Sequence, residues 1–261
     1  MVDIIRYKEN RLVRGDNIQG YPEDIEKAIL VGSEVLVGLS NGGVYRENEQ
    51  LYRFRSPVTA LHHGANGLWA AAGLDVVNIL GDEVRPGSLH NIYWNYEKIT
   101  ALHASELNGR PVLFAGSDHG RLILADEELR ELNVDGRRTQ FSVVGAAEIK
   151  KIMENGNIYF GAERLYVLGK NDADLCNIEA FGGELSDFTV IDSGIVTASE
   201  YGVWCLRNSG EEKWGESGAM KTVGRLEDKV VVHYEDNKFV LFNQSGEELE
   251  KGKAIGTLVL G

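Results

Sequence analysis

Two histidines occupy matching places in two similar stretches of the sequence. His62 lies in "TALHH" and His103 lies in "TALHA", 41 residues further on. Imidazole is the commonest ligand of transition metals in proteins, so two histidines on neighbouring strands could share an ion. A metal site needs a third or fourth ligand, and the spacing supplies none. Duplication of a repeated unit explains the match without a function, and we expect no metal and no other cofactor.

Acidic residues or their amides follow short apolar runs at six places along the chain. Asp118 and His119, in "GSDHG", come nearest to a catalytic pair, but one turn does not make a Ser-His-Asp triad. Asp and Asn are also the residues that tight hairpin turns prefer. On one shared face, their charge would attract a basic partner or a cation. The six residues are Asn41, Asp75, Asp118, Glu163, Glu200 and Asp236.

A cluster of aromatic residues lies in "LHNIYWNYEKI", residues 89–99. Tyr93, Trp94 and Tyr96 fall within four positions, in a chain with 8% aromatic residues. On an exposed connection, such a cluster would be a hot spot for protein binding, whereas on a strand alternate residues would be core. The candidate partner-binding residues are therefore these aromatics with the acidic turns, and we name no catalytic residue. In full they are Asp75, Tyr93, Trp94, Tyr96, Asp118, His119, Glu163, Glu200 and Asp236.

The elements that carry these residues form a repeated unit of about 37 residues. Each unit has a short apolar run, such as "VLFAGSDHG" or "IVTASEYG", followed by a polar turn and a further apolar stretch. Helical periodicity is weak, and we interpret "EDIEKAI" and "AAEIKKIMENG" as strands. Four short antiparallel strands in a unit of this length predict a blade of a β-propeller. The runs begin at 35, 68, 112, 158, 195, 230 and 258.

The two ends of the chain are expected to complete one blade together. "YKENRLVRG" (7–15) resembles "YRENEQLYRF" (45–54), the predicted third and fourth strands of the first complete blade. "KAIGTLVLG" (253–261) would add one or two inner strands and so remove exposed sheet edges. We predict one all-β domain, 1–261, a propeller of seven four-stranded blades, with six blades as the alternative. The approximate blades are 23–54, 56–96, 97–138, 139–182, 185–217, 218–250, and 251–261 with 1–20.

One repeat contains a phrase that returns 36 residues later. In "VWCLRNSGEEKW" (203–214), Asn208, Ser209 and Gly210 supply a turn, and Trp214 returns on the outer strand to pack on the next blade. The second copy is "FVLFNQSGEELEKG" (239–252). The phrase resembles the repeat of PQQ-like (quinoprotein-type) propellers, within a pattern that is WD40-like overall. The resemblance implies a propeller scaffold and no particular activity, since that family includes dehydrogenases, outer-membrane assembly factors and pure scaffolds.

The features that the dehydrogenases and assembly factors of that family require are missing. The dehydrogenases are far longer and carry a calcium and quinone site beside adjacent cysteines, but Cys176 and Cys205 stand apart. The assembly factors need an export signal and a lipidated cysteine near the start, and "MVDIIRYKEN" offers neither. Two cysteines are also too few for a disulfide framework, so we expect both to be reduced.

Charge and hydropathy narrow the class of partner. The net charge is -13, with acids spread along all 261 residues and no Lys/Arg cluster, which argues against nucleic acid or an anionic membrane as partner. No apolar stretch approaches the ~18 residues that span a bilayer. We expect a cytoplasmic protein that is a monomer on its own.

We interpret the sequence as a non-catalytic protein-interaction scaffold that binds a partner, which could be basic, on one propeller face. The alternative is a small-molecule enzyme, or a metal-binding or ligand-binding propeller, with a site at the mouth of the central channel. An enzyme would gather perturbed ionisable groups in one pocket, and a scaffold would expose a binding patch.

Overall fold

The computed structural model describes most of the chain. Its described residues are 5–89, 97–107, 109–130, 132, 140–142, 147–170, 175–178, 184–207, 212–226, 228–253 and 257–258. All regular structure in these ranges is β. Of the two stretches interpreted as strands, "EDIEKAI" runs into the strand Ile25–Val31, and "AAEIKKIMENG" contains the strand Lys151–Asn155. Within the same ranges, no helix is long and apolar enough to cross a membrane.

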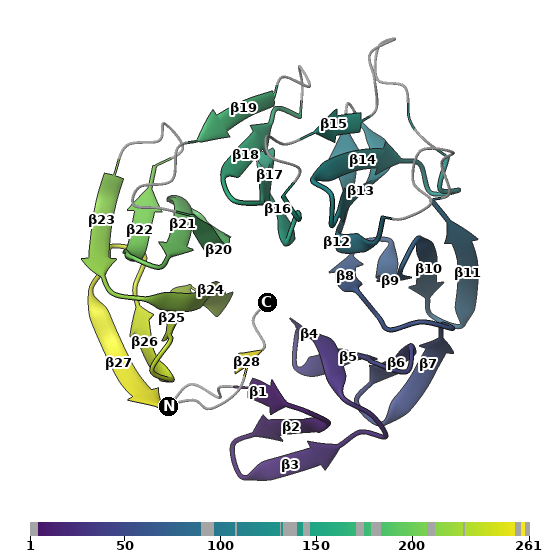
Figure 1. Cartoon of the computed structure of the whole chain (residues 1–261), viewed down its shortest axis with the longest axis horizontal. Helices are drawn as coiled ribbons and strands as arrows, with labels where there is room; N and C mark the ends of the chain where they lie inside the picture. Colours follow the sequence, from purple (N-terminus) through teal and green to yellow (C-terminus); the bar gives the residue numbers. More distant parts are fainter. Residues whose placement is uncertain are drawn as a thin grey trace.

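Seven four-stranded antiparallel sheets stand around a central axis as the blades of a propeller (Figure 1), which confirms the predicted fold. The blades are numbered in chain order, and the first, which joins both ends of the chain, is described last. The strands of blade 2 are β4(Ile25–Val31), β5(Glu34–Leu39), β6(Gly43–Arg46) and β7(Glu49–Arg53). Those of blade 3 are β8(Ala60–Gly64), β9(Gly67–Ala72), β10(Asp75–Leu80) and β11(Glu83–Ser88). Those of blade 4 are β12(Ile99–Leu107), β13(Arg110–Ser117), β14(Arg121–Ala125) and β15(Gln140–Ser142).

The second half of the ring repeats this order, with the first strand of each blade nearest the axis. Blade 5 contains β16(Lys151–Asn155), β17(Asn157–Gly161), β18(Leu165–Leu168) and β19(Leu175–Ile178). Blade 6 contains β20(Leu185–Ile191), β21(Gly194–Ser199), β22(Gly202–Leu206) and β23(Glu212–Ser217). Blade 7 contains β24(Met220–Leu226), β25(Lys229–Tyr234), β26(Lys238–Phe242) and β27(Glu248–Lys253).

The remaining blade, here called the composite blade, joins both ends of the chain. Its order is β28(Thr257–Leu258), β1(Ile5–Lys8), β2(Arg11–Arg14) and β3(Asn17–Gly20). Residues 7–15 therefore span its second and third strands, and the prediction that they match third and fourth strands was wrong. The similarity to residues 45–54 reflects a shared turn, because Glu9 and Glu47 both have positive φ, 52° and 50°. A turn geometry can recur at either hairpin of a blade.

Hydrophobic clusters lie at every interface between neighbouring blades in the described part of the chain. Second strands such as β5 are buried over most of their length, because each is covered on both faces by adjacent blades. Close packing explains Gly38, where a Cβ atom would lie 2.4 Å from Cγ1 of Val58 in the next blade. The cluster between blade 7 and the composite blade is the smallest, with Val231, Phe239, Leu241 and Leu258 buried.

The repeated phrase is described in its second copy, where Asn243 holds the turn. Its Oδ1 accepts hydrogen bonds from the backbone N–H groups of Ser245 (3.0 Å) and Glu247 (2.9 Å). Trp214, from the first copy, packs on Phe242 of the next blade with ring centroids 5.5 Å apart, as predicted. Its indole is half-buried. Residues 208–210 of the first copy lie outside the described residues.

Connections between blades and the turns between second and third strands occupy one face of the propeller, here called the turn face. Backbone hydrogen bonds link the two sets: Ser40 N–H donates to Asp24 O (2.9 Å), Asp118 N–H to Lys98 O (3.0 Å), and Leu185 N–H to Glu163 O (3.0 Å). The turn face therefore combines segments from successive blades on a rigid frame.

Candidate functional site

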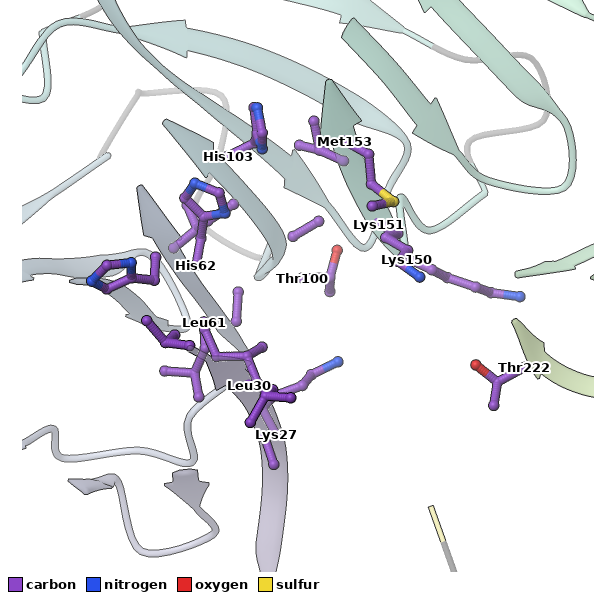
Figure 2. Close-up of a pocket in the computed structure, with 18 of the residues that line it drawn as sticks. Lys27, Leu30, Leu61, His62, Thr100, His103, Lys150, Lys151, Met153 and Thr222 are labelled. Carbon is purple, nitrogen blue, oxygen red and sulfur yellow. The ribbon is translucent and has the colours of Figure 1, made fainter. Parts of the chain in front are cut away.

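A cavity of about 550 Å³ occupies the central channel. The inner strands β4, β8, β12, β16, β24 and β28 contribute to its wall. Figure 2 shows side chains from several blades directed toward the same space. The labelled lining residues are Lys27, Leu30, Leu61, His62, Thr100, His103, Lys150, Lys151, Met153 and Thr222.

The structure brings His62 and His103 together in this cavity. They pair with Trp69 and Phe114 at equivalent positions of β8 and β12, and their ring centroids are 4.6 Å apart. Burial, and then the proximity of His103 and His63, lowers the pKa of His62 to about 3. Among the described residues, no three His, Cys, Asp or Glu side chains gather in a way that could hold a metal ion. The two rings form a packed contact between blades 3 and 4.

Glu154 is the centre of a polar cluster between blades 4 and 5 that the sequence did not reveal. Its carboxylate lies 3.2 Å from His103 Nε2 and accepts hydrogen bonds from the Ser105 hydroxyl and the Lys170 amine. Lys170 also donates to Ser105 Oγ over 3.2 Å. The hydrogen bond from His103, with those from Lys170 and Ser105, lowers the pKa of Glu154 to about 2. Its partners belong to distant parts of the chain, so local spacing carries no signal.

Asp187 connects three inner strands at the turn-face end of the channel. It accepts a hydrogen bond from Lys151 Nζ of β16 at 3.2 Å. It also accepts hydrogen bonds from the Thr222 hydroxyl and, at 3.0 Å, the Val223 N–H, both on β24. Through these hydrogen bonds, one carboxylate connects blades 5, 6 and 7 and fixes their relative positions.

The predicted acidic residues all lie at the turns between second and third strands, on the turn face. Asp75, Glu163, Glu200 and Asp236 are exposed, and Asp118 is half-buried. Asp118 Oδ1 accepts hydrogen bonds from Lys98 N–H (2.9 Å) and His119 Nδ1 (2.9 Å). Asp236 Oδ1 accepts one from Lys238 N–H (3.0 Å). These two carboxylates stabilise their own turns, in addition to any charge that they present.

His119 is exposed beside Asp118, and its hydrogen bond to that carboxylate raises the pKa of the imidazole. The Asp118 carboxylate therefore favours the protonated form of His119 at this point of the face. The predicted aromatic residues Tyr93, Trp94 and Tyr96 lie outside the described residues.

Sequence reasoning missed two residues of the turn face. Glu9 is exposed in the equivalent turn of the composite blade, which extends the acidic series to the point where the ring closes. Tyr201 follows Glu200 in "SEYG" and is 59% exposed. Packing of the core does not explain an aromatic residue at an exposed position in a hairpin turn. The tyrosine in this turn was therefore the signal in the sequence for a binding residue. Glu200 raises the pKa of the Tyr201 hydroxyl through a hydrogen bond.

Comparison with known proteins gives matches in structure alone. No protein-family model and no curated protein matches the sequence. The WD40 repeats of RRP9 superpose with a TM-score of 0.71 at 10% identity, covering 98% of this chain and 85% of that one. The computationally designed Ika8 protein has a TM-score of 0.70 at 16% identity, covering 99% and 89%.

A further solved structure extends the likeness. The Neurospora crassa Pan2 WD40 domain has a TM-score of 0.65 at 12% identity, covering 89% of this chain and 80% of that one. Identities this low show the fold alone. The chain is a seven-bladed β-propeller, similar in architecture to WD40 domains.

Proposed function

We propose that this protein is a non-catalytic scaffold that binds a protein partner on its turn face. The observation that carries the proposal is Tyr201, an exposed aromatic side chain in a turn, beside the exposed carboxylate of Glu200. Tyrosines supply much of the binding energy at protein interfaces because they bury a large area and lose little rotamer entropy. Here the aromatic group projects from a rigid blade.

Charge on the same face indicates the kind of partner. Exposed acids recur around the ring at Glu9, Asp75, Glu163, Glu200 and Asp236. They add to a net charge of -13, so a basic protein surface would be attracted over a distance of about one Debye length, ~8 Å at physiological salt. We therefore propose a basic partner.

The ionisable groups of the channel support a structural role for that region. Glu154 and Asp187 each accept several hydrogen bonds from neighbouring blades, and their donors hold them in place. A general acid or base needs a pKa near the working pH, whereas the pKa of Glu154 is about 2 and that of His62 is about 3. The WD40 neighbours are consistent with a binding platform. Tyr93, Trp94 and Tyr96 remain candidates for the same role from their sequence.

The test compares proteins retained from native lysate by immobilised wild type, Tyr201→Ala and Ile18→Ala. Ile18 is 66% exposed on the outer strand β3, so it is a matched control away from the turn face. At least one partner should be retained by wild type and by Ile18→Ala but reduced about tenfold or more by Tyr201→Ala. Equal retention by all three proteins would place the interface elsewhere.

Rate measurements on the retained partner test the role of the acids. Glu163→Gln with Glu200→Gln should slow association at low salt and have little effect at high salt, since surface charges act mainly on the association rate. Tyr201→Ala should speed dissociation at either salt concentration. A double Gln variant that associates as fast as wild type at low salt would rule out electrostatic steering by these residues.

A further inference from the structure

Three lysines lie at the turn-face end of the central cavity. Lys27 is near the start of β4, Lys150 precedes β16, and Lys151 is its first residue. Lys27 pairs with Gly38 and Lys151 with Gly161, and each glycine lies close to the turn that follows its strand. The pairing places these lysines where the channel opens on the turn face.

Two of these lysines have no acidic partner among the described residues. Lys151 is paired with Asp187, but neither Lys27 nor Lys150 forms an ion pair with any carboxylate of the described residues. The chain has 40 acidic and 27 basic residues, so acidic partners outnumber basic ones. Two lysines in one cavity without a carboxylate partner among the described residues are therefore unexpected. Lys27 is half-buried and Lys150 is exposed at the opening. Both ammonium groups would attract an anion that enters the cavity.

The arrangement of the groups suits a ligand that sits between them. In Figure 2 the Lys27 amine points into the cavity from one side, and the Lys150 and Lys151 side chains extend from another direction. The Thr222 hydroxyl lies opposite Lys27 and donates its hydrogen bond to Asp187. Leu30, Leu61 and Met153 also line the cavity. One part of the lining is therefore cationic and much of the rest is apolar. The wall also includes His62, His103 and the Glu154 carboxylate, whose charge is already compensated by Lys170.

We propose that the central channel binds a small organic anion with at least two negative charges. Its phosphate or carboxylate group would contact Lys27 and Lys150, and its less polar part would lie against Leu30 and Leu61. A cavity of about 550 Å³ is within the ~300–1,000 Å³ range of small-molecule sites. The proposal rests on the cavity and is independent of the partner proposed for the turn face.

The experiment is calorimetric titration of the purified 261-residue chain with pyrophosphate and, separately, with citrate at low ionic strength. The proteins are wild type, Lys27→Gln/Lys150→Gln, and Lys253→Gln. Lys253 is exposed on the outer strand β27 and controls for loss of a positive charge outside the channel. Binding to the surface at large is disfavoured by the net charge of -13, so a measured affinity reports a local cationic site.

Wild type and Lys253→Gln should bind at least one probe with a submillimolar Kd, weakened by added salt, and the double variant should bind at least tenfold more weakly. The tighter probe identifies the headgroup as phosphate or carboxylate. Without anion, the double variant should melt close to wild type, because neither lysine pairs with a carboxylate of the described residues. The anion should raise the Tm of wild type and should not raise that of the double variant. Binding of neither probe by wild type at 10 mM, or equal binding by the double variant, would overturn the proposal.

Discussion

The imidazole rings of His62 and His103 lie with their centroids 4.6 Å apart, on the inner strands of neighbouring blades. Burial, together with the nearby His103 and His63, lowers the pKa of His62 from its usual 6.5 to about 3. In the unfolded chain, His62 takes up a proton below about pH 6.5, which it cannot do in the folded protein until about pH 3. The folded state therefore loses stability as the pH falls through this window.

The first prediction concerns this loss. Wild type should lose up to about 1 kcal/mol of unfolding free energy per pH unit between roughly pH 6 and pH 4.5. His62→Gln should show a shallower dependence in urea denaturation at pH 7.5, 6 and 5. His63→Gln, an exposed neighbour that contributes less to the shift than burial does, should stay close to wild type. The lowered pKa of Glu154 adds a further loss only below about pH 4.5. If the unfolding free energies of all three proteins changed equally with pH, the assignment of this pH dependence to His62 would be contradicted.

The second prediction concerns the polar cluster between blades 4 and 5. Glu154→Gln leaves Lys170 and His103 without their carboxylate, and we expect a loss of about 1–3 kcal/mol in chemical denaturation at pH 7. The loss is moderated because the side chains of Glu154 and Lys170 are 28% and 21% exposed. Adding Lys170→Met should recover part of it. Glu148→Gln, at an exposed position, is the control, and an equal loss there would show that the cluster has no special role.

The third prediction concerns close packing between blades 2 and 3. Gly38→Ala places a methyl group 2.4 Å from Val58 Cγ1 and 2.7 Å from its Cβ, so a backbone must move. We expect a cost of about 1–3 kcal/mol, seen as a lower Tm. Gly20→Ala is a matched control, because a Cβ atom there meets nothing within 4 Å. If both variants melt together, the two blades are less tightly packed than the structure indicates.

The fourth prediction concerns closure of the ring. Leu258 is 5% exposed and completes the small cluster with Val231, Phe239 and Leu241, so Leu258→Ala should cost about 2–4 kcal/mol. Deleting residues 257–261 should have a larger effect, because it exposes the edge of β1 that pairs with β28. Hydrogen exchange should show lost protection in β1 before the other blades. A truncated protein with unchanged protection in β1 would argue against closure by this strand.

The sequence was sufficient to predict the seven blades, because apolar second strands and acidic or amide turns recur in each unit. The equivalence of His62 and His103 followed from the same repetition. The polar cluster could not be predicted in this way, since Glu154 is 51 residues from His103 and contacts it only because two blades pack together. The lysines of the channel were missed for the same reason: Lys27 and Lys150 are distant in sequence, and the ring brings them to one cavity.

The half-buried state of Trp214 is another feature that the sequence does not predict. Its repeat position predicted contact with the next blade, and Phe242 provides it. The degree of burial depends on how far the neighbouring turn reaches over the indole, and that turn is fixed by the side chain of Asn243 on another blade. A pattern within one repeat does not contain this information.

The composite blade also has a consequence for the time at which the protein can fold. β1 leaves the ribosome about 250 residues before β28, its partner in the sheet. At ~5–20 residues per second, the N-terminal hairpin waits on the order of ten to fifty seconds for the strand that completes its sheet. Blades 2 to 7 can form in order during synthesis, whereas the ring closes only after translation of the last blade. Throughout that interval, the open edge of β1 is a site where a chaperone or a neighbouring nascent chain could bind.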